Sequence, residues 1–337
     1  MLGNESGALL AVLFSFLVNR SQAAQTPPAQ APVTAPQVID EVEKNFGIHP
    51  GRRRNHTKGI CAQGNFIGDR DMARYSRSAL FSGKAVPVVA RFSVAGGNPD
   101  VADTARNPRG MALEFRLPGG SLQHMTMINT PMFGAATPKT FFDNLIATRP
   151  DPQTGKPDPA KVKAFLQSHP DAVAQAEFLQ QNNPPPSWAN SAYFGIHAFR
   201  LIDAAGKATP VRWAFLPRDG EKRLSEEAMS TSARDFLGPV LIRCLRKGPV
   251  RWDMQVSLGE AGDPLDDPSM PWPSGRQRIR AGVLTIQSAT PGKGGACEPI
   301  NYDPLVMADG IAPTDDPILN FRSPAYAVSF AKRRAGE

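Results

Sequence analysis

The sequence lacks most of the short motifs that identify common enzyme classes. It has no GxGxxG segment, no P-loop, no HExxH helix and no internal repeat, so it does not indicate a dinucleotide-binding fold, an NTPase, a zinc metalloprotease or a solenoid. Cysteine is scarce too, with three residues and no CxxC pair. The odd number leaves two alternatives: a Cys244–Cys297 disulfide, or buried free thiols, which we expect.

Long hydrophobic runs are also missing. The run "ALLAVLFSFLV" (8–18) has 11 residues, too few to span a bilayer but enough for the apolar part of a signal peptide. Ser21, Gln22 and Ala23 offer a small-x-small cleavage site, although "MLGNESG" before the run lacks the usual positive charge. We expect a signal peptide over 1–24, no stable membrane insertion, and a periplasmic or secreted protein.

A linker and one large domain follow the predicted signal peptide. The segment "QTPPAQAPVTAP" (25–36) is rich in proline and predicts a disordered linker. A single β-rich domain can exceed about 250 residues. We therefore expect one domain over 37–337.

Acidic residues are outnumbered, 31 against 38 Lys and Arg, which gives a net charge of +7. The positive charge is dense only in "GRRR" (51–54) and "AKRR" (331–334), and aromatic residues are not interleaved with it. A nucleic-acid partner is therefore the weakest interpretation, and we expect none. Short arginine clusters also bind carboxylates through bidentate pairs, which would explain them locally.

Turn residues and alternating apolar residues indicate an α+β fold. The chain has 29 glycines and 33 prolines, and regular helices do not separate the apolar stretches. This pattern favours an antiparallel β-barrel or sheet with helical insertions over a doubly wound fold. We predict strands at 85–97, 109–120, 124–133, 250–259 and 279–289, and a hairpin over 191–217 with its turn at "AAGK". Helices are predicted at 159–181, with Ser168 as an internal N-cap before Pro170, at 224–247, and near 317–334.

Arg322 and Tyr326 are four residues apart in the last helix and therefore share one of its faces. The positive charge of an arginine favours the phenolate form of a neighbouring tyrosine, and a phenolate can bind ferric iron. On these two residues alone, an exposed surface pair is the favoured interpretation, because such pairs are common on surface helices. His124, His169 and His197 are interpreted as structural or exposed residues, with His197 on a buried strand.

Four blocks of the sequence together resemble those of haem catalases. They occur in the expected order: "RRRNHTKGICAQGNF" (52–66), "VPVVARFSVAGGNPDVADTARNPRGMALEFRLPGG" (86–120), "INTPMF" (128–133) and "NYDPLVMADGIAPTDDPILNFRSPAY" (301–326). Unlike full-length catalases, the chain has no long N-terminal arm and ends soon after the tyrosine helix. It resembles the short catalase-related peroxidases. The resemblance implies a β-barrel of the haem-catalase type, helical insertions, and a C-terminal helix that carries the axial tyrosine.

The resemblance implies roles for residues on both sides of a haem b group. His56 matches the distal histidine that carries the peroxide proton, Ser93 the serine that orients its ring, and Asn129 the asparagine that binds peroxide. Tyr326 matches the axial ligand of the iron, and Arg322 matches the arginine that keeps it ionised.

Further residues match positions around the edge of the haem. Arg53, Arg91 and Arg333 match arginines that pair with the haem propionates, and Phe141 matches a phenylalanine that covers the haem face. Asn55 departs from the family pattern, because "RRNH" (53–56) replaces "RVVH" and puts a polar residue where an apolar one is expected near the haem.

The resemblance implies an exported haem peroxidase. Its substrates would be hydrogen peroxide or organic hydroperoxides and small organic electron donors, with weak or no catalase activity, and it would be a monomer or a homodimer. A minimal monofunctional catalase and an enzyme that rearranges fatty-acid hydroperoxides are alternatives. From another class, a haem-binding or storage protein without turnover remains, but such a protein needs neither His56 nor Asn129.

Overall fold

The computed structural model describes residues 31–337. The predicted signal peptide and the start of the predicted linker lie outside the described residues. Among residues 31–337, no helix combines the length and the apolar character that a membrane crossing requires.

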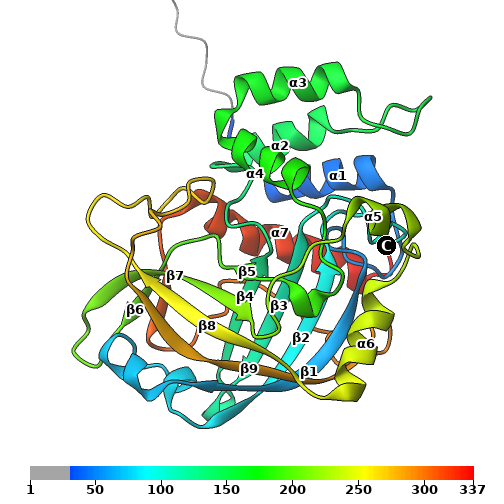
Figure 1. The fold of residues 1–337 in the computed structure, drawn as a ribbon. Coiled ribbons are helices and arrows are strands. Elements are labelled where there is room, and N and C mark those ends of the chain that lie inside the picture. The colour runs from blue at the N-terminus through cyan, green and yellow to red at the C-terminus, as the bar shows by residue number, and fades with distance from the viewer. Residues whose placement is uncertain (1–30) are drawn as a thin grey trace, which may run out of the picture. The chain divides into compact units, whose positions relative to one another are not determined.

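An eight-stranded antiparallel β-barrel forms the centre of the described chain (Figure 1). Its strands pair in the order β7-β5-β4-β3-β2-β1-β9-β8, and a further β8–β7 pairing closes the ring. The barrel strands are β1 (Gly59–Gly68), β2 (Ala85–Val94), β3 (Arg109–Arg116), β4 (Leu122–Ile128), β5 (Tyr193–Phe194), β7 (Ala208–Pro217), β8 (Val250–Leu258) and β9 (Arg278–Pro291). Two short strands, β6 (Phe199–Ile202) and β10 (Ile311–Pro313), extend the sheet beyond β7. The predicted antiparallel barrel is confirmed.

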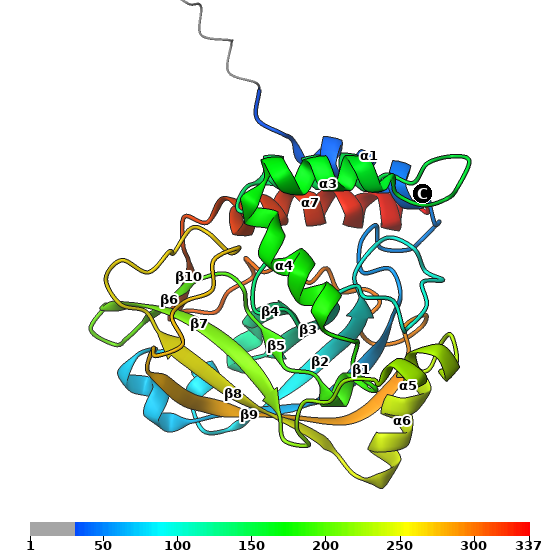
Figure 2. The same cartoon turned by 45° about the horizontal axis from the view of Figure 1, so that its top comes forward.

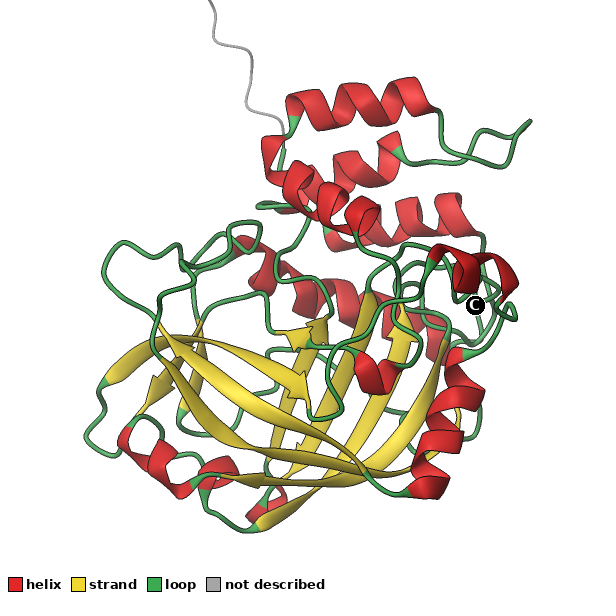
Figure 3. Ribbon diagram, viewed as in Figure 1, coloured by secondary structure: helices red, strands yellow, loops and turns green. Residues whose placement is uncertain are grey.

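Within residues 31–337, seven α-helices lie outside the barrel (Figure 3). They are α1 (Ala35–Phe46), α2 (Pro138–Ala147), α3 (Pro159–Ser168), α4 (Pro170–Gln181), α5 (Glu226–Thr231), α6 (Leu237–Lys247) and α7 (Pro317–Arg334). Figure 2 shows α1 and α7 together at one side of the barrel, with α3 in front of them. The helical layer over this side therefore combines segments from the start, the middle and the end of the described chain.

Aromatic side chains fill the barrel. Phe92 of β2 is fully buried and stacks on Trp188 and Trp252, with ring centroids 6.0 and 5.6 Å apart. Successive side chains of a strand point to opposite faces. Arg91 and Ser93 therefore point out of the barrel, toward the helical layer.

The predicted strands and helices are mostly confirmed, with shifted ends. The expected hairpin is formed by β6 and β7, and its turn lies at residues 203–207. The predicted strand 124–133 ends at Ile128 in β4. The helix over 224–247 is interrupted, because α5 and α6 are separate.

The predicted N-cap at Ser168 is wrong. Ser168 is the last residue of α3, and its hydroxyl donates to the carbonyl oxygens of Ala164 and Phe165. The cap of α4 is His169, whose side chain makes no capping hydrogen bond. A serine hydroxyl can return to its own helix in this way, which makes it unavailable to the next one.

The predicted linker ends earlier than residue 36. Thr34 forms a capping box with Gln37, and α1 begins at Ala35, which is buried. Pro36 occupies the first turn of the helix, where its missing N–H has no cost. The last proline of the predicted linker segment is therefore part of a helix start.

Candidate functional site

The outer face of the barrel at β2, β3 and β4 forms one wall of the candidate site. Ser93 of β2 pairs with Gly110 of β3, and Arg91 pairs with Ala112. On the next strand, Thr126 lies opposite Ala112. These residues alternate with buried neighbours of the barrel core, so they share the face that the helices cover.

His56 lies on the loop before β1 in an unusual backbone conformation. Its φ is 52°, and no other non-glycine residue between 31 and 337 has a positive φ. The side-chain oxygen of Asn55 accepts hydrogen bonds of 2.8 Å from the backbone N–H groups of His56 and Gly96. Residues held in sparsely populated conformations concentrate at functional sites, so this strain marks His56. The Asn55 oxygen is occupied by backbone groups, so it adds less polarity to the pocket than the sequence suggested.

The His56 ring is placed by Ser93 and Gly110. Nδ1 of His56 lies 2.9 Å from the Ser93 hydroxyl oxygen, which agrees with the orienting role expected for Ser93. A Cβ on Gly110 would lie 2.6 Å from that hydroxyl and 2.8 Å from His56 Nδ1. Only glycine leaves room for the ring here. The sequence analysis missed Gly110, whose role depends on β2–β3 pairing.

The surroundings of His56 favour its neutral form. Burial, with a further contribution from the charges of Arg91, Arg322 and Arg53, lowers the pKa of the imidazole to about 3. The ring is therefore neutral near pH 7. In the tautomer whose Nδ1–H donates to Ser93, Nε2 keeps the lone pair that can accept a proton.

Asn129 is fixed at the end of β4 by the backbone of β3. Its side-chain oxygen accepts from the Arg109 N–H at 2.7 Å, and its own N–H donates to the Arg109 carbonyl at 2.9 Å. The residue is buried, and within residues 31–337 its side-chain NH₂ group has no hydrogen-bond partner. This amide can donate to a ligand in the site.

Tyr326 lies on α7, four residues after Arg322 as predicted. Nη2 of Arg322 donates to the Tyr326 hydroxyl oxygen at 2.6 Å and to the Thr126 hydroxyl at 2.7 Å. The arginine thus joins α7 to the barrel wall. Its positive charge stabilises an ionised phenol electrostatically.

A buried histidine and an aspartate hold Arg322 from behind. Arg322 Nη1 lies 3.0 Å from His197 Nε2, and His197 Nδ1 lies 2.7 Å from Asp316 Oδ2. Because arginine only donates, Nε2 must accept, so His197 carries its proton on Nδ1 and donates it to Asp316. Desolvation lowers the pKa of His197, which keeps the ring neutral, although the Asp316 bond opposes this shift.

The structure corrects one prediction about His197. It is buried as expected, but it lies between β5 and β6 and belongs to the Tyr326 side of the site rather than to a strand. The other oxygen of Asp316 caps α7 by accepting from the N–H groups of Ile318 and Leu319. Sequence reasoning missed this network, although "TDDP" (314–317) has the form of a helix start, which could have indicated Asp316.

Three arginines form a positive cluster beside the site. Burial, together with the charges of Arg91 and Arg333, lowers the pKa of Arg53 to about 9. None of the three forms a carboxylate ion pair within residues 31–337, and the buried Nη2 of Arg333 has no partner there. A cluster of this kind fits a ligand that carries carboxylates, as the propionates of haem do.

Phe141 lies farther from these groups. It is a half-buried residue of α2 that stacks on Phe133, with ring centroids 5.7 Å apart. Both α2 and α7 contribute to the same apolar cluster, in which Phe141 accompanies Phe321. Its predicted place over the haem face stays a prediction.

The expectations for cysteine are wrong. Cys61 and Cys297 form a disulfide with a Cα–Cα distance of 5.2 Å, and Cys244 is the free cysteine. The two partners are 236 residues apart in sequence, and only the β1–β9 pairing brings them together. Strand neighbours cannot be read from a single sequence, so no sequence feature favoured this pair.

The arrangement offers a single ligand for iron. Between residues 31 and 337, no group of three His, Cys, Asp or Glu side chains could hold a metal ion. The phenol of Tyr326 is the predicted ligand, which suits an iron whose other ligands come from a porphyrin. The residues present therefore fit haem: a phenol oxygen for the metal, and arginines for the carboxylates of the cofactor.

Comparisons with known proteins agree with this geometry. The sequence matches the family described as Catalase over residues 37–337. It is 50% identical over 327 residues to the catalase-related peroxidase of Synechococcus elongatus, which covers 97% of this chain and 96% of that protein. The catalase-related peroxidase of Mycolicibacterium paratuberculosis is 35% identical over 305 residues, which covers 90% of this chain and 96% of that one.

Full-length catalases are more distant. Catalase from Rattus norvegicus is 28% identical over 285 residues, which covers 80% of this chain but 54% of that protein. Among solved structures, catalase A from Saccharomyces cerevisiae matches with a TM-score of 0.78 at 23% identity, covering 85% of this chain and 62% of that one. At this identity the structural match shows a shared fold.

Proposed function

This chain belongs to the catalase family, as one of its short members, and from that premise we propose a haem-dependent peroxidase. It reduces hydrogen peroxide or organic hydroperoxides and oxidises small organic donors, with weak or no catalase activity. Two relatives that match almost end to end are named catalase-related peroxidases, which supports the proposal. The observation that carries it is the pairing of a strained, neutral His56 with Ser93, beside the unpaired amide of Asn129.

Each of these side chains has a part in the proton chemistry. The neutral His56 accepts the proton of a bound peroxide at Nε2 and returns it to the departing oxygen. Ser93 holds the ring so that Nε2 faces the substrate, and Asn129 donates a hydrogen bond that orients the peroxide. Neither carbonyl nor carboxylate competes for the Asn129 amide among the described residues.

The opposite side of the site holds the cofactor, which we propose to be haem b. Tyr326 would bind the iron, Arg322 would keep the phenol ionised, and Arg53, Arg91 and Arg333 would pair with the propionates. When bound, haem supplies the two-electron chemistry with peroxide and the subsequent oxidation of the donor.

We also propose that the protein is exported and acts as a monomer or a homodimer. The Cys61–Cys297 disulfide supports export, because such bonds persist in oxidising compartments and are rare in the cytosol. Recovery of a mature chain that begins near residue 25 from the periplasm or the medium would test the export. Light scattering of the purified protein would give its subunit number.

The test of the main proposal is steady-state turnover with hydrogen peroxide alone and with hydrogen peroxide plus an aromatic donor. We expect donor oxidation to exceed oxygen release, and to exceed the rate of free haem at the same concentration, which is the control. Oxygen release that dominates at every donor concentration would instead show a minimal catalase, the candidate favoured by the similarity to full-length catalases. Tight haem binding without either activity would instead show a haem-binding protein without turnover.

A further inference from the structure

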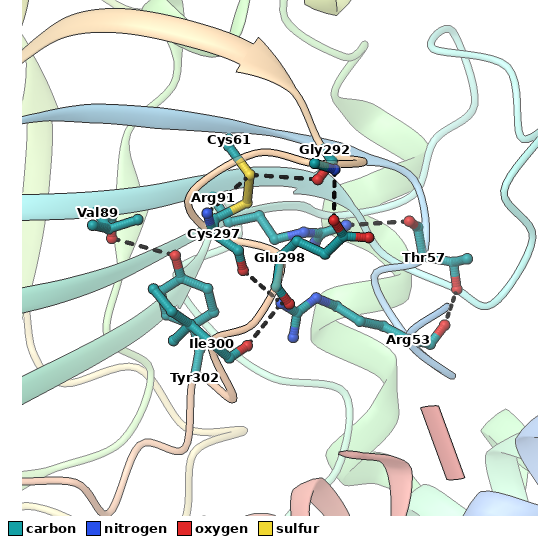
Figure 4. The surroundings of a disulfide bond; sticks show 11 residues. Arg53, Thr57, Cys61, Val89, Arg91, Gly292, Cys297, Glu298, Ile300 and Tyr302 are labelled. Carbon is teal, nitrogen blue, oxygen red and sulfur yellow. Dashed lines mark hydrogen bonds between the residues drawn. A yellow bond between two sulfur atoms is a disulfide. The ribbon is translucent and has the colours of Figure 1, made fainter. Parts of the chain in front are cut away.

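The guanidinium of Arg53 is held by the loop that follows β9. Its Nη2 donates to the carbonyl oxygens of Cys297, Glu298 and Ile300, at 3.0, 3.3 and 2.8 Å. Figure 4 shows the arginine side chain reaching this loop from the segment before Thr57. The guanidinium also lies 5.7 Å from the ring centre of Tyr302, which faces it.

This contact orients the arginine without neutralising it. Backbone carbonyls satisfy Nη2, whereas Nε and Nη1 have no hydrogen-bond partner among residues 31–337. Arg53 has no carboxylate ion pair in that range either. The loop therefore fixes one nitrogen and leaves the N–H groups of Nε and Nη1, together with the positive charge, for an anionic ligand such as a propionate.

The loop itself has no helix or strand between the end of β9 and Ile300. It is tied to β1 by the Cys61–Cys297 disulfide, and the Cys297 N–H lies 3.1 Å from the Cys61 sulfur. Both cysteines are buried, and a Cβ on Gly295 would lie 2.6 Å from the Cys61 sulfur. The disulfide is thus the covalent anchor of the carbonyl groups that hold Arg53.

We propose that the Cys61–Cys297 disulfide is a positioning element for the cofactor: it fixes the carbonyl groups that orient Arg53 toward a haem propionate. Without the disulfide the loop gains conformational freedom, the carbonyl groups lose their fixed positions, and Arg53 must be ordered by the ligand itself. That ordering lowers the affinity for the ligand. The proposal rests on the proposed haem function, and it makes haem retention depend on the thiol–disulfide state of the protein.

The experiment measures the rate at which the holoprotein transfers haem to excess apomyoglobin. Cys61→Ala/Cys297→Ala is expected to lose haem about 10 to 100 times faster, the effect of weakening one charge-assisted contact. The matched control is Cys244→Ala, which removes the half-buried free thiol of α6 and should leave the rate unchanged.

A double-mutant cycle with Arg53→Gln separates positioning from general stability. If the disulfide acts through Arg53, removing it in the Arg53→Gln background should change haem loss little. An equal acceleration in both backgrounds would overturn the proposal, as would an unchanged rate in the double cysteine variant.

Gly295→Ala keeps both cysteines but crowds the Cys61 sulfur, and it serves if the double variant does not fold. It should also accelerate haem loss, and a wild-type rate would count against the proposal. A wild-type protein that takes up no haem would refute the proposed function, whereas equal haem retention with and without the disulfide would refute only this inference.

Discussion

The two sides of the candidate site hold their key side chains by different means. On the distal side, which we define by His56, the side chain lies on a loop and is placed by a serine, by the space above Gly110, and by backbone bonds to Asn55. On the proximal side, defined by Tyr326, the side chain lies on an 18-residue helix and contacts the cationic Arg322.

The difference follows from what each side must do. A group that accepts a proton must stay neutral and keep a lone pair, so uncharged contacts and nearby arginines suit His56. A tyrosine binds ferric iron through a phenolate oxygen, so a fixed positive charge suits Tyr326. Substitutions of Tyr326 should therefore affect cofactor binding, and substitutions of His56 or of the residues that place its ring should affect rates.

The largest effect is expected from Tyr326→Phe. A phenyl ring offers no anionic oxygen to the iron, so haem occupancy should fall from nearly full to a small fraction. Absorbance in the Soret region and pyridine haemochrome analysis measure it. Tyr75→Phe makes the same chemical change in the loop between β1 and β2 and should keep its haem. Full occupancy with an unchanged spectrum in Tyr326→Phe would remove the proximal assignment.

Asn55→Val tests the distal side without touching the ring of His56. It removes the acceptor of two backbone hydrogen bonds, each worth about 0.5–1.5 kcal/mol, so the strained backbone at His56 is held less well. We expect the reaction with peroxide to slow about tenfold while haem is retained. Stopped-flow mixing gives the rate.

Asn55→Asp is the matched control, because it keeps an acceptor oxygen at the same position. It should restore most of the wild-type rate. If Asn55→Val and Asn55→Asp slow the reaction equally, the backbone hydrogen bonds are not the cause.

A smaller effect is expected where the two sides meet, at Glu43 of α1. Its carboxylate accepts from Arg54 of the distal loop at 2.6 Å and from Lys332 of α7 at 2.7 Å. Burial alone would raise the pKa of Glu43. The hydrogen bonds from Lys332 and Arg54 outweigh this effect and lower the pKa. Glu43→Gln should lower the free energy of unfolding by about 1–2 kcal/mol at pH 7, because it leaves the buried Arg54 without a carboxylate.

The contribution of Glu43 to the free energy of unfolding depends on pH. A lowered pKa stabilises the fold above the unfolded-state pKa, and the stabilisation is lost as the pH falls through the folded-state pKa. The difference between wild type and Glu43→Gln in urea unfolding should therefore shrink in acid. Asp40→Asn, which removes an exposed partner of Lys332, should cost less than about 1 kcal/mol. A Glu43→Gln difference that does not shrink as the pH is lowered through the acid range would contradict this account.

The sequence predicted the parts of the site that depend on local spacing or on motifs. Arg322 and Tyr326 are one helical turn apart, so a helix prediction alone brings them together. His56, Ser93 and Asn129 were found through motifs of the family. Alternating strands without regular helices between them indicated an antiparallel barrel or sheet, and the resemblance to haem catalases implied the barrel.

Contacts between distant segments could not be predicted in this way. His197 meets Arg322 across 125 residues, and Cys61 meets Cys297 across 236. Such pairs depend on strand order and register, which hydrophobic alternation leaves open. Gly110 matters because of what packs above it, and a single sequence does not show that.

The division between the two sides is tested most directly by His56→Ala. The variant should keep its haem, because Tyr326 and the arginine cluster are unchanged. Its reaction with hydrogen peroxide, followed by rapid-mixing spectroscopy, should be about 10²–10⁴ times slower than in the wild type. Asn129→Ala should cost less, because it removes a hydrogen-bond donor and no proton carrier. The lowered pKa of His56 also predicts a wild-type rate without an inflection near pH 6.5. A wild-type rate in haem-loaded His56→Ala would contradict the account.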